Sequence, residues 1–240
     1  MVPYTVYSIF NYLTVNICIF IKNLSSHCGG DISSKGISFF NIPAFINNSV
    51  SQSFAEGWVS TVAKINNCIF ESNHTNGDGG AIYSDINNII KYCIFVYNSA
   101  EECADGIYLD GNGNSICCCT FAYNSAYTGG SIDLRGNNFV DSFSFVNNST
   151  SSGGAIYFRG GVIANSSFTN THVIRYGGDM DMERYTFSSN CVFNHSWADD
   201  GWINDGGDIY SREAKLIIVL LIIILLLVKA RLFIHSEKIF

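Results

Sequence analysis

The sequence is poor in charge and in proline, and both shortages narrow its class. Charged residues make up 14% of the 240 residues, against ~25% in ordinary soluble proteins. Only two prolines occur, while glycine reaches 22 residues, which suits many short strands joined by tight turns. The net charge of −7 lacks the basic surface that phosphate backbones require, so no nucleic-acid partner is predicted. Sustained 3.6-residue periodicity is missing before residue 212, which argues against helical repeats.

Signatures of catalysis and of metal binding are scarce as well. The nine cysteines are an odd number, which leaves at least one thiol unpaired. No Cys-x-x-Cys pair of metal-site type occurs, and neighbours such as Cys117 and Cys118 face opposite sides of a strand. The five histidines show no ligand spacing, and phosphate loops and nucleophile elbows are lacking. We therefore predict no catalytic residue, no metal site and no cofactor.

What the sequence has instead is an internal repeat of about 25 residues. Its first element is a phenylalanine followed three residues later by asparagine. Six copies are strict: Phe20 with Asn23, Phe45 with Asn48, Phe70 with Asn73, Phe95 with Asn98, Phe121 with Asn124, and Phe145 with Asn148. Two weaker copies follow, Phe168 with Thr171 and Phe193 with Ser196. Six strict copies in one register are very improbable by chance.

Two further features keep the same period. Gly-Gly pairs lie ahead of an apolar residue, as in Gly79-Gly80 before Ile82 and Gly129-Gly130 before Ile132. A cysteine precedes several of the phenylalanines by two residues, at positions 18, 68, 93, 119 and 191. Each repeat is therefore interpreted as a strand, an asparagine turn, a glycine corner, a second strand and a variable return.

These features predict an all-β fold over residues 1–212, a right-handed parallel β-helix of about eight coils. Stacking coils ~4.8 Å apart places equivalent residues on top of one another. The phenylalanines then form a column that fills the core, and the asparagines form a column whose amides bond from coil to coil. The glycine pairs allow a positive φ or a close approach of coils, and the cysteines form a row of small buried side chains.

The double motif resembles the repeats of the polymorphic outer membrane protein family. The nearest copies are Phe70-Glu71-Ser72-Asn73 with Gly79-Gly80-Ala81-Ile82, and Phe145-Val146-Asn147-Asn148 with Gly153-Gly154-Ala155-Ile156. The resemblance implies a pectin-lyase-like β-helix and a surface-exposed protein, with adhesion as a role known among its members. Bacterial members end in an outer-membrane barrel, whereas this sequence ends in an apolar segment. That departure predicts a relative that is anchored differently.

The C-terminal segment is predicted to cross a membrane once. Thirteen aliphatic residues run from Leu216 to Val228 between two lysines, and a span over residues 213–234 reaches the thickness of a bilayer core when flanking cations snorkel. The alternative is a capping helix on the end of the β-helix. The lysine and arginine bias favours a cytoplasmic tail at residues 235–240, which places the β-helix outside the plasma membrane. Sequons at positions 23, 47, 73, 147, 148, 165 and 194 lend some support to an exterior location.

The function expected from these features is adhesion or recognition at the cell surface, without catalysis. Its partners would be the membrane and a host or matrix protein or glycan. The alternative is a carbohydrate-active enzyme, a polysaccharide lyase or a glycosidase, because parallel β-helices include both. The candidates for a glycan or calcium site lie together near the end of the repeats: Asp199, Asp200, Trp202, Asp205 and Asp208. A solvated, turn-rich last coil is the favoured interpretation of this cluster.

Overall fold

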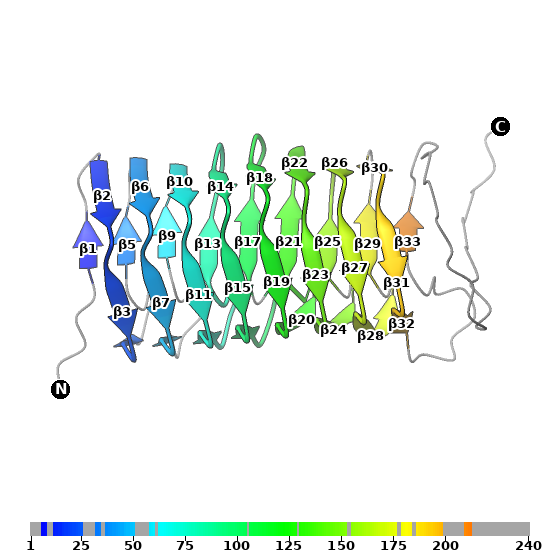
Figure 1. Ribbon diagram of the computed structural model, residues 1–240, viewed down its shortest axis with the longest axis horizontal. Coiled ribbons are helices and arrows are strands. Elements are labelled where there is room, and N and C mark those ends of the chain that lie inside the picture. Colours follow the sequence, from blue (N-terminus) through cyan, green and yellow to red (C-terminus); the bar gives the residue numbers. More distant parts are fainter. Residues whose placement is uncertain are drawn as a thin grey trace.

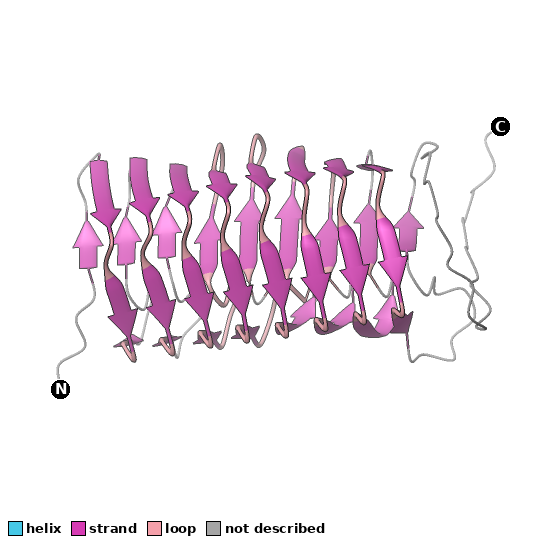
Figure 2. Cartoon of the chain, in the orientation of Figure 1, coloured by secondary structure: helices cyan, strands magenta, loops and turns pink. Residues whose placement is uncertain are grey.

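The computed structural model is an all-β parallel β-solenoid (Figure 1, Figure 2). It describes residues 6–8, 12–25, 32–34, 37–50, 58–60, 62–104, 106–128, 130–152, 155–176, 179–183, 186–198 and 209–212. Each coil contributes one short strand to each of four sheets, here called A, B, C and D. The predicted parallel solenoid is thus confirmed, whereas its right-handed sense stays a prediction.

The strands pair only with their equivalents in the coils before and after. Sheet A consists of β1 (Val6–Ser8), β5 (Ile32–Ser34), β9 (Trp58–Ser60), β13 (Ile82–Ser84), β17 (Ile107–Asp110), β21 (Ile132–Arg135), β25 (Ile156–Phe158), β29 (Met180–Glu183) and β33 (Ile209–Arg212). Sheet B consists of β2 (Tyr12–Asn16), β6 (Ile37–Asn41), β10 (Val62–Asn66), β14 (Ile89–Lys91), β18 (Ser115–Cys117), β22 (Asn138–Asp141), β26 (Gly161–Ala164) and β30 (Thr186–Ser189).

The other two sheets continue each coil after sheet B. Sheet C consists of β3 (Ile19–Ile21), β7 (Ala44–Ile46), β11 (Ile69–Glu71), β15 (Ile94–Val96), β19 (Thr120–Ala122), β23 (Ser144–Val146), β27 (Ser167–Thr169) and β31 (Val192–Asn194). Sheet D consists of β4 (Leu24–Ser25), β8 (Ser49–Val50), β12 (His74–Thr75), β16 (Ser99–Ala100), β20 (Ser125–Thr128), β24 (Ser149–Ser152), β28 (His172–Tyr176) and β32 (Trp197–Ala198). Figure 1 shows sheets B and C on the near side of the rod and sheet A behind them.

The phenylalanine of the repeat lies at the centre of every strand of sheet C and points into the core. Successive rings, from Phe20 to Phe193, stack with centroids 4.6 to 5.3 Å apart and planes within 19° of parallel. The strict register of parallel pairing causes this stack, because each phenylalanine pairs with the phenylalanine of the next coil. Isoleucines and leucines of sheets A and B fill the remainder of the core.

The asparagine of the repeat is buried at the turn between sheets C and D. The side-chain oxygen of Asn98 accepts hydrogen bonds from the backbone N and Nδ2 of Asn73, at 3.1 and 2.9 Å. Its own Nδ2 donates to the carbonyl oxygen of Phe70 at 3.1 Å and to Oδ1 of Asn124 at 3.2 Å. The pattern recurs along the rod, so that a buried amide satisfies backbone groups of neighbouring coils.

A second asparagine column, which the period did not reveal, precedes sheet B. Oδ1 of Asn114 accepts from the backbone N and Nδ2 of Asn88 at 2.9 and 2.7 Å, and Asn138 plays the same part for Asn114. The sequence conceals this column because its members are buried only in three successive coils and their spacing varies from 26 to 24 residues.

The sharpest turns differ from the glycine corners that the sequence suggested. Positive φ angles occur at residues before the cysteine and the asparagine columns, and most of these are not glycine: Ile17, Ile42, Asn67, Tyr92, Cys118, Ser142, Asn165 and Asn190 before sheet C, and Lys22, Asn47, Ser72, Tyr97, Tyr123, Asn147, Asn170 and His195 before sheet D. Glycine serves both predicted purposes: Gly79, in a Gly-Gly corner, has a φ of 68°, and other glycines allow close approach. A Cβ on Gly106 would lie 2.6 Å from the carbonyl oxygen of Ser131 in the next coil.

The cysteine column is buried at positions 68, 93, 119 and 191, while Cys18 is exposed. All eight cysteines in the described ranges are free thiols. Burial raises the pKa of the Cys119 thiol, which keeps it protonated. These side chains therefore act in the core as small apolar groups.

Part of the predicted architecture lies outside the described residues. The membrane segment 213–234 and the tail 235–240 belong to this part, which begins directly after the last residue of β33, Arg212. Among the residues that the structure describes, no helix has the length and apolar character needed to cross a bilayer.

Truncating one amide of the buried column is expected to destabilise the solenoid. In Asn98→Ala, the backbone N of Asn73 and the carbonyl of Phe70 lose buried partners, so the free energy of unfolding should fall by about 2–4 kcal/mol. Urea unfolding followed by circular dichroism measures the loss. The control Asn137→Ala, at an exposed position, should change stability by less than about 0.5 kcal/mol. Equal effects of the two substitutions would contradict the role of the column.

Relieving a strained turn is expected to stabilise the solenoid. Ile42 is 51% exposed and has a φ of 61°, a conformation that disfavours β-branched side chains and favours asparagine. Ile42→Asn should therefore raise the free energy of unfolding by about 1 kcal/mol. Ile69→Asn is the matched control, because Ile69 is 41% exposed but lies in a strand, where asparagine is disfavoured. The two substitutions should change the urea midpoint in opposite directions.

Candidate functional site

Sheet A presents a column of polar side chains on its outer face. Alternate residues of each strand point into the core, as Ile107 and Leu109 do, both fully buried. Tyr108 lies between these two residues and Asp110 follows them, so both point outward. The same alternation holds in the neighbouring strands β13, β21, β25 and β29.

Parallel pairing brings the outward residues of successive coils into line. Tyr108 pairs with Asp133, Asp133 with Tyr157, and Tyr157 with Asp181. A second line runs beside the first, because Asp110 pairs with Arg135. Residues some 25 positions apart thus form one cluster of carboxylates, guanidinium groups and phenols.

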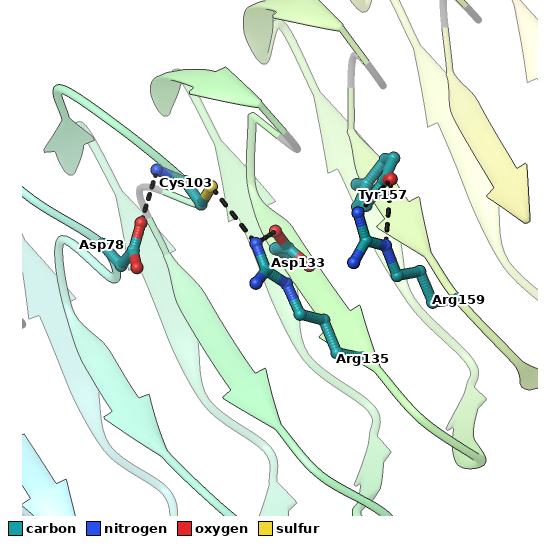
Figure 3. A network of polar contacts seen from close by, with 6 residues as sticks. All are labelled: Asp78, Cys103, Asp133, Arg135, Tyr157 and Arg159. Carbon is teal, nitrogen blue, oxygen red and sulfur yellow. Dashed lines mark hydrogen bonds and ion pairs between the residues drawn. The ribbon is translucent and has the colours of Figure 1, made fainter.

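Asp133 is the most enclosed member of this cluster. Its side chain is 0% exposed, and Oδ2 accepts a hydrogen bond from Nη2 of Arg135 at 3.3 Å (Figure 3). The Arg135 side chain is 30% exposed and lies between the carboxylate and the solvent. Oδ1 of Asp133 and Nε of Arg135 are buried and have no hydrogen-bond partner. A buried acceptor and a buried donor are therefore left unsatisfied within one ion pair.

The tyrosines on either side hold the two arginines in place. The guanidinium of Arg135 lies 4.8 Å from the ring centroid of Tyr108. Tyr83 stacks on Tyr108 with centroids 5.0 Å apart and an interplanar angle of 12°. Arg159 donates from Nε and Nη2 to the Tyr157 hydroxyl, at 3.0 and 2.8 Å (Figure 3). The arginines are thus oriented by aromatic rings as well as by charge.

The loop that leads into sheet A contributes two more residues. The backbone N of Cys103 donates to Oδ1 of Asp78 at 3.0 Å, and Nη2 of Arg135 lies 3.6 Å from the Cys103 sulfur (Figure 3). Burial, followed by the Asp133 charge, raises the pKa of the Cys103 thiol. The thiol therefore stays protonated and is a poor nucleophile.

Burial also sets the electrostatics of the central pair. Desolvation raises the pKa of Asp133 to about 6, although the Arg135 guanidinium acts in the opposite direction. Burial is the largest single influence on Arg135 and lowers its pKa, but the charge and the hydrogen bond of Asp133, with Tyr108 and Cys103, together raise that pKa above its ordinary value. Desolvation, with Asp110 as a second cause, raises the pKa of Asp85 at the edge of the cluster.

The chemistry available at this face is recognition of polar groups. It combines an acceptor at Asp133, donors at Arg135 and Arg159, and the hydroxyls of two tyrosines. Within the described ranges, no group of three or more His, Cys, Asp or Glu residues has the geometry to hold a metal ion.

The sequence suggested a different set of site residues. Asp199, Asp200, Trp202, Asp205 and Asp208 lie outside the described residues, so their role stays a prediction.

A further buried aspartate lies at the end of the asparagine column, away from the cluster on sheet A. Asp179 is buried, and its Oδ1 accepts hydrogen bonds from the hydroxyls of Thr171 and Ser196, the latter at 2.6 Å. It completes the polar column where threonine and serine replace asparagine.

The cluster on sheet A was missed because its members differ in type from coil to coil. Tyr108, Asp133 and Tyr157 follow the same apolar position of the repeat, two or three residues after a glycine. The alternation predicts that such residues point outward, but it does not reveal which outward residues are buried. A search of each outward column for mixed charge would have found Arg135 and Arg159.

The fold and its repeat define the class of this protein, a parallel β-solenoid with a coil of about 25 residues. Residues 67–85 and 142–159 match the family model of the Chlamydia polymorphic membrane protein repeat. The predicted resemblance is therefore confirmed in these two segments, which both run from a corner of sheet C to the outward arginine or aspartate of sheet A. No curated protein and no solved structure matches the chain.

The raised pKa of Asp133 predicts a specific dependence of stability on pH. The pKa of Asp133 is higher in the folded state than in the unfolded state. Its contribution to the free energy of unfolding is therefore fully present below pH 4 and is lost as the pH rises through about 6. Asp133→Asn removes that loss. The variant should therefore gain about 2–3 kcal/mol relative to the wild type between pH 4 and pH 7. Urea unfolding at a series of pH values tests this, and a difference that does not vary with pH would contradict it.

Proposed function

We propose that this chain is a membrane-associated protein of the cell surface that recognises a host or matrix molecule through the outer face of sheet A. In this proposal the solenoid lies outside the plasma membrane, residues 213–234 cross it once and the tail is cytoplasmic. The protein holds its ligand and carries out no reaction on it. The ligand is a polar surface of a protein or a glycan.

The location is supported by the kind of repeat that the chain carries. The matching family model describes the repeat of a membrane protein, and surface exposure is the role that this resemblance implies. Three of the sequon asparagines, Asn47, Asn165 and Asn194, are exposed, whereas Asn73 and Asn148 are buried in the polar column. An exterior solenoid would offer the exposed sequons, and not the buried ones, for modification.

The single observation that carries recognition is the incomplete hydrogen bonding of the Asp133–Arg135 pair. A buried acceptor and a buried donor without partners cost free energy in the isolated protein. A ligand that offers a hydroxyl or an amide, and that displaces the solvent-exposed end of Arg135, would satisfy both. Sites that leave polar groups unpaired in the free state favour such ligands over apolar ones.

The contacts of the Tyr108 ring restrict how a ligand is held. Tyr83 stacks on this ring, and the Arg135 guanidinium also lies over it. Stacking of a sugar ring on Tyr108 would compete with both contacts. We therefore expect the ligand to be bound through hydrogen bonds to side-chain ends, and through ion pairs with Arg159, instead of through stacking.

Substitutions on sheet A are expected to abolish binding to an array. The full chain, in detergent, is applied to printed sulfated and neutral glycans and to collagen, fibronectin and laminin. Arg159→Glu and Arg135→Ala should lower the signal at bound spots by about ten-fold or more, because each removes a donor that meets the ligand. Lys64→Glu, an exposed cation on sheet B, is the control and should retain the signal. Binding that survives both arginine substitutions would refute sheet A as the recognition face.

Protease shaving of intact cells tests the location independently. With a tag placed after residue 240, external trypsin should reduce the tagged band to a small membrane-bound remnant, because the solenoid precedes the proposed span. Survival of the full-length band on intact cells, with loss after permeabilisation, would place the solenoid inside and would overturn the surface assignment.

A further inference from the structure

The outer face of sheet C carries exposed aliphatic side chains in its first four coils. We call this the apolar strip; its main members are Ile19, Ile21, Ile42, Ile69, Ile94 and Tyr97, which are 68, 51, 51, 41, 45 and 55% exposed. Exposed apolar side chains are ordinary when scattered, but contiguous ones mark a surface that binds something. The register places Ile19, Ile69 and Ile94 in one column, with Ala44 between the first two, and Ile42 and Tyr97 lie in the turns at either end of sheet C.

In one outward column of sheet C, the side chains change from aliphatic to hydroxyl-bearing along the rod. In the first four coils the column runs from Ile19 through Ala44 and Ile69 to Ile94. In the next three it continues as Thr120, Ser144 and Ser167, and in the last coil it ends at Val192, which is 43% exposed. The pleat, the register and the outward direction are the same in both halves. The fold therefore tolerates hydroxyl side chains at this position, and the aliphatic half needs another explanation.

Charge is distributed unevenly around the same coils. On sheets B and C and their turns, as far as residue 97, the described charges are Lys22, Lys64 and Lys91 against Glu71 alone. Sheet A and the loops beside it, as far as residue 135, carry one described cation, Arg135, and six described carboxylates: Asp78, Asp85, Glu101, Glu102, Asp110 and Asp133. Figure 1 shows sheets B and C on one side of the rod and sheet A on the other. In the first four coils the described cations thus lie beside the exposed aliphatic groups, whereas Arg135 and Arg159 lie farther along the rod, on or beside sheet A.

From this juxtaposition we infer that the apolar strip docks on the surface of a bilayer that contains anionic lipids. Exposed isoleucines would enter the boundary between headgroups and acyl chains, Tyr92 and Tyr97 would lie at the level of the headgroups, and the three lysines would meet lipid phosphates. Each such lysine contributes attraction that depends on anionic lipid and weakens with salt.

The size of the strip favours a lipid surface over a second copy of the chain. Four coils at ~4.8 Å spacing and about six residues of sheet and corners cover roughly 300 Å². A stable protein interface needs ~800 Å² on each partner. Three lysines would also face the same three lysines across a symmetric contact of two such faces. Docking on a bilayer lays the rod along the membrane and leaves the outer face of sheet A directed away from it.

Site-specific photocrosslinking tests the inference in the full chain. The chain is added to vesicles of phosphatidylcholine, alone or mixed with phosphatidylglycerol, with p-benzoylphenylalanine replacing Ile94, Ser144 or Asp110 in separate preparations. Lipid adducts should form at position 94 about five-fold or more above positions 144 and 110, and only with phosphatidylglycerol present. Because the readout is local, insertion of another segment of the chain does not mimic it.

Matched substitutions supply the controls. Ile69→Asp, on the same column and outward, should reduce the adducts at position 94 by about five-fold, whereas Ser144→Asp should not. Lys22→Glu with Lys64→Glu should abolish the dependence on phosphatidylglycerol without touching the core. Thermal unfolding confirms that each variant is folded. Equal lipid adducts at positions 94, 144 and 110 would overturn the inference, and so would adducts at position 94 between two protein chains.

Discussion

In-register stacking of one coil on the next is the constraint on which the structure depends. Parallel pairing sets the same short distance between all equivalent residues. A residue at a repeated position must therefore pack well against the same residue type in the next coil. Phenylalanine meets this demand because its ring stacks offset on an identical ring. Asparagine meets it because one amide both donates and accepts, as Asn98 does between Asn73 and Asn124.

The same constraint explains where the repeat tolerates change. The amide column ends at Thr171 and Ser196, whose hydroxyls can share only part of its hydrogen bonds. The Asp179 carboxylate enters the gap from the following corner and bonds to both. At the turns, by contrast, the backbone conformation is kept while the residue varies from Ile42 to Asn165. Backbone hydrogen bonds between coils hold these turns even where the side chain disfavours them.

Because the core is made by a few inward positions, the outward positions are free to differ from coil to coil. On sheet A they bring together the buried Asp133, its partner Arg135 and the Tyr157–Arg159 pair. On sheet C they change from isoleucine to serine and threonine halfway along the rod. The rod thus presents two chemically different faces, one with buried and charged polar groups and one with exposed aliphatic side chains in its first coils.

The sequence alone determined the solenoid, because a period of about 25 residues relates Phe70 to Phe95 and Asn73 to Asn98 without any knowledge of the fold. It also indicated the inward alternation of sheet A. It could not reveal the ion pair at Asp133, since the environment of that carboxylate comes from Tyr108 and Tyr157, which stand one coil away on either side. It could not show that the positive φ angles belong to Ile42 and its equivalents. Burial and backbone conformation depend on neighbours about 25 residues distant, and only the tertiary structure brings those neighbours together.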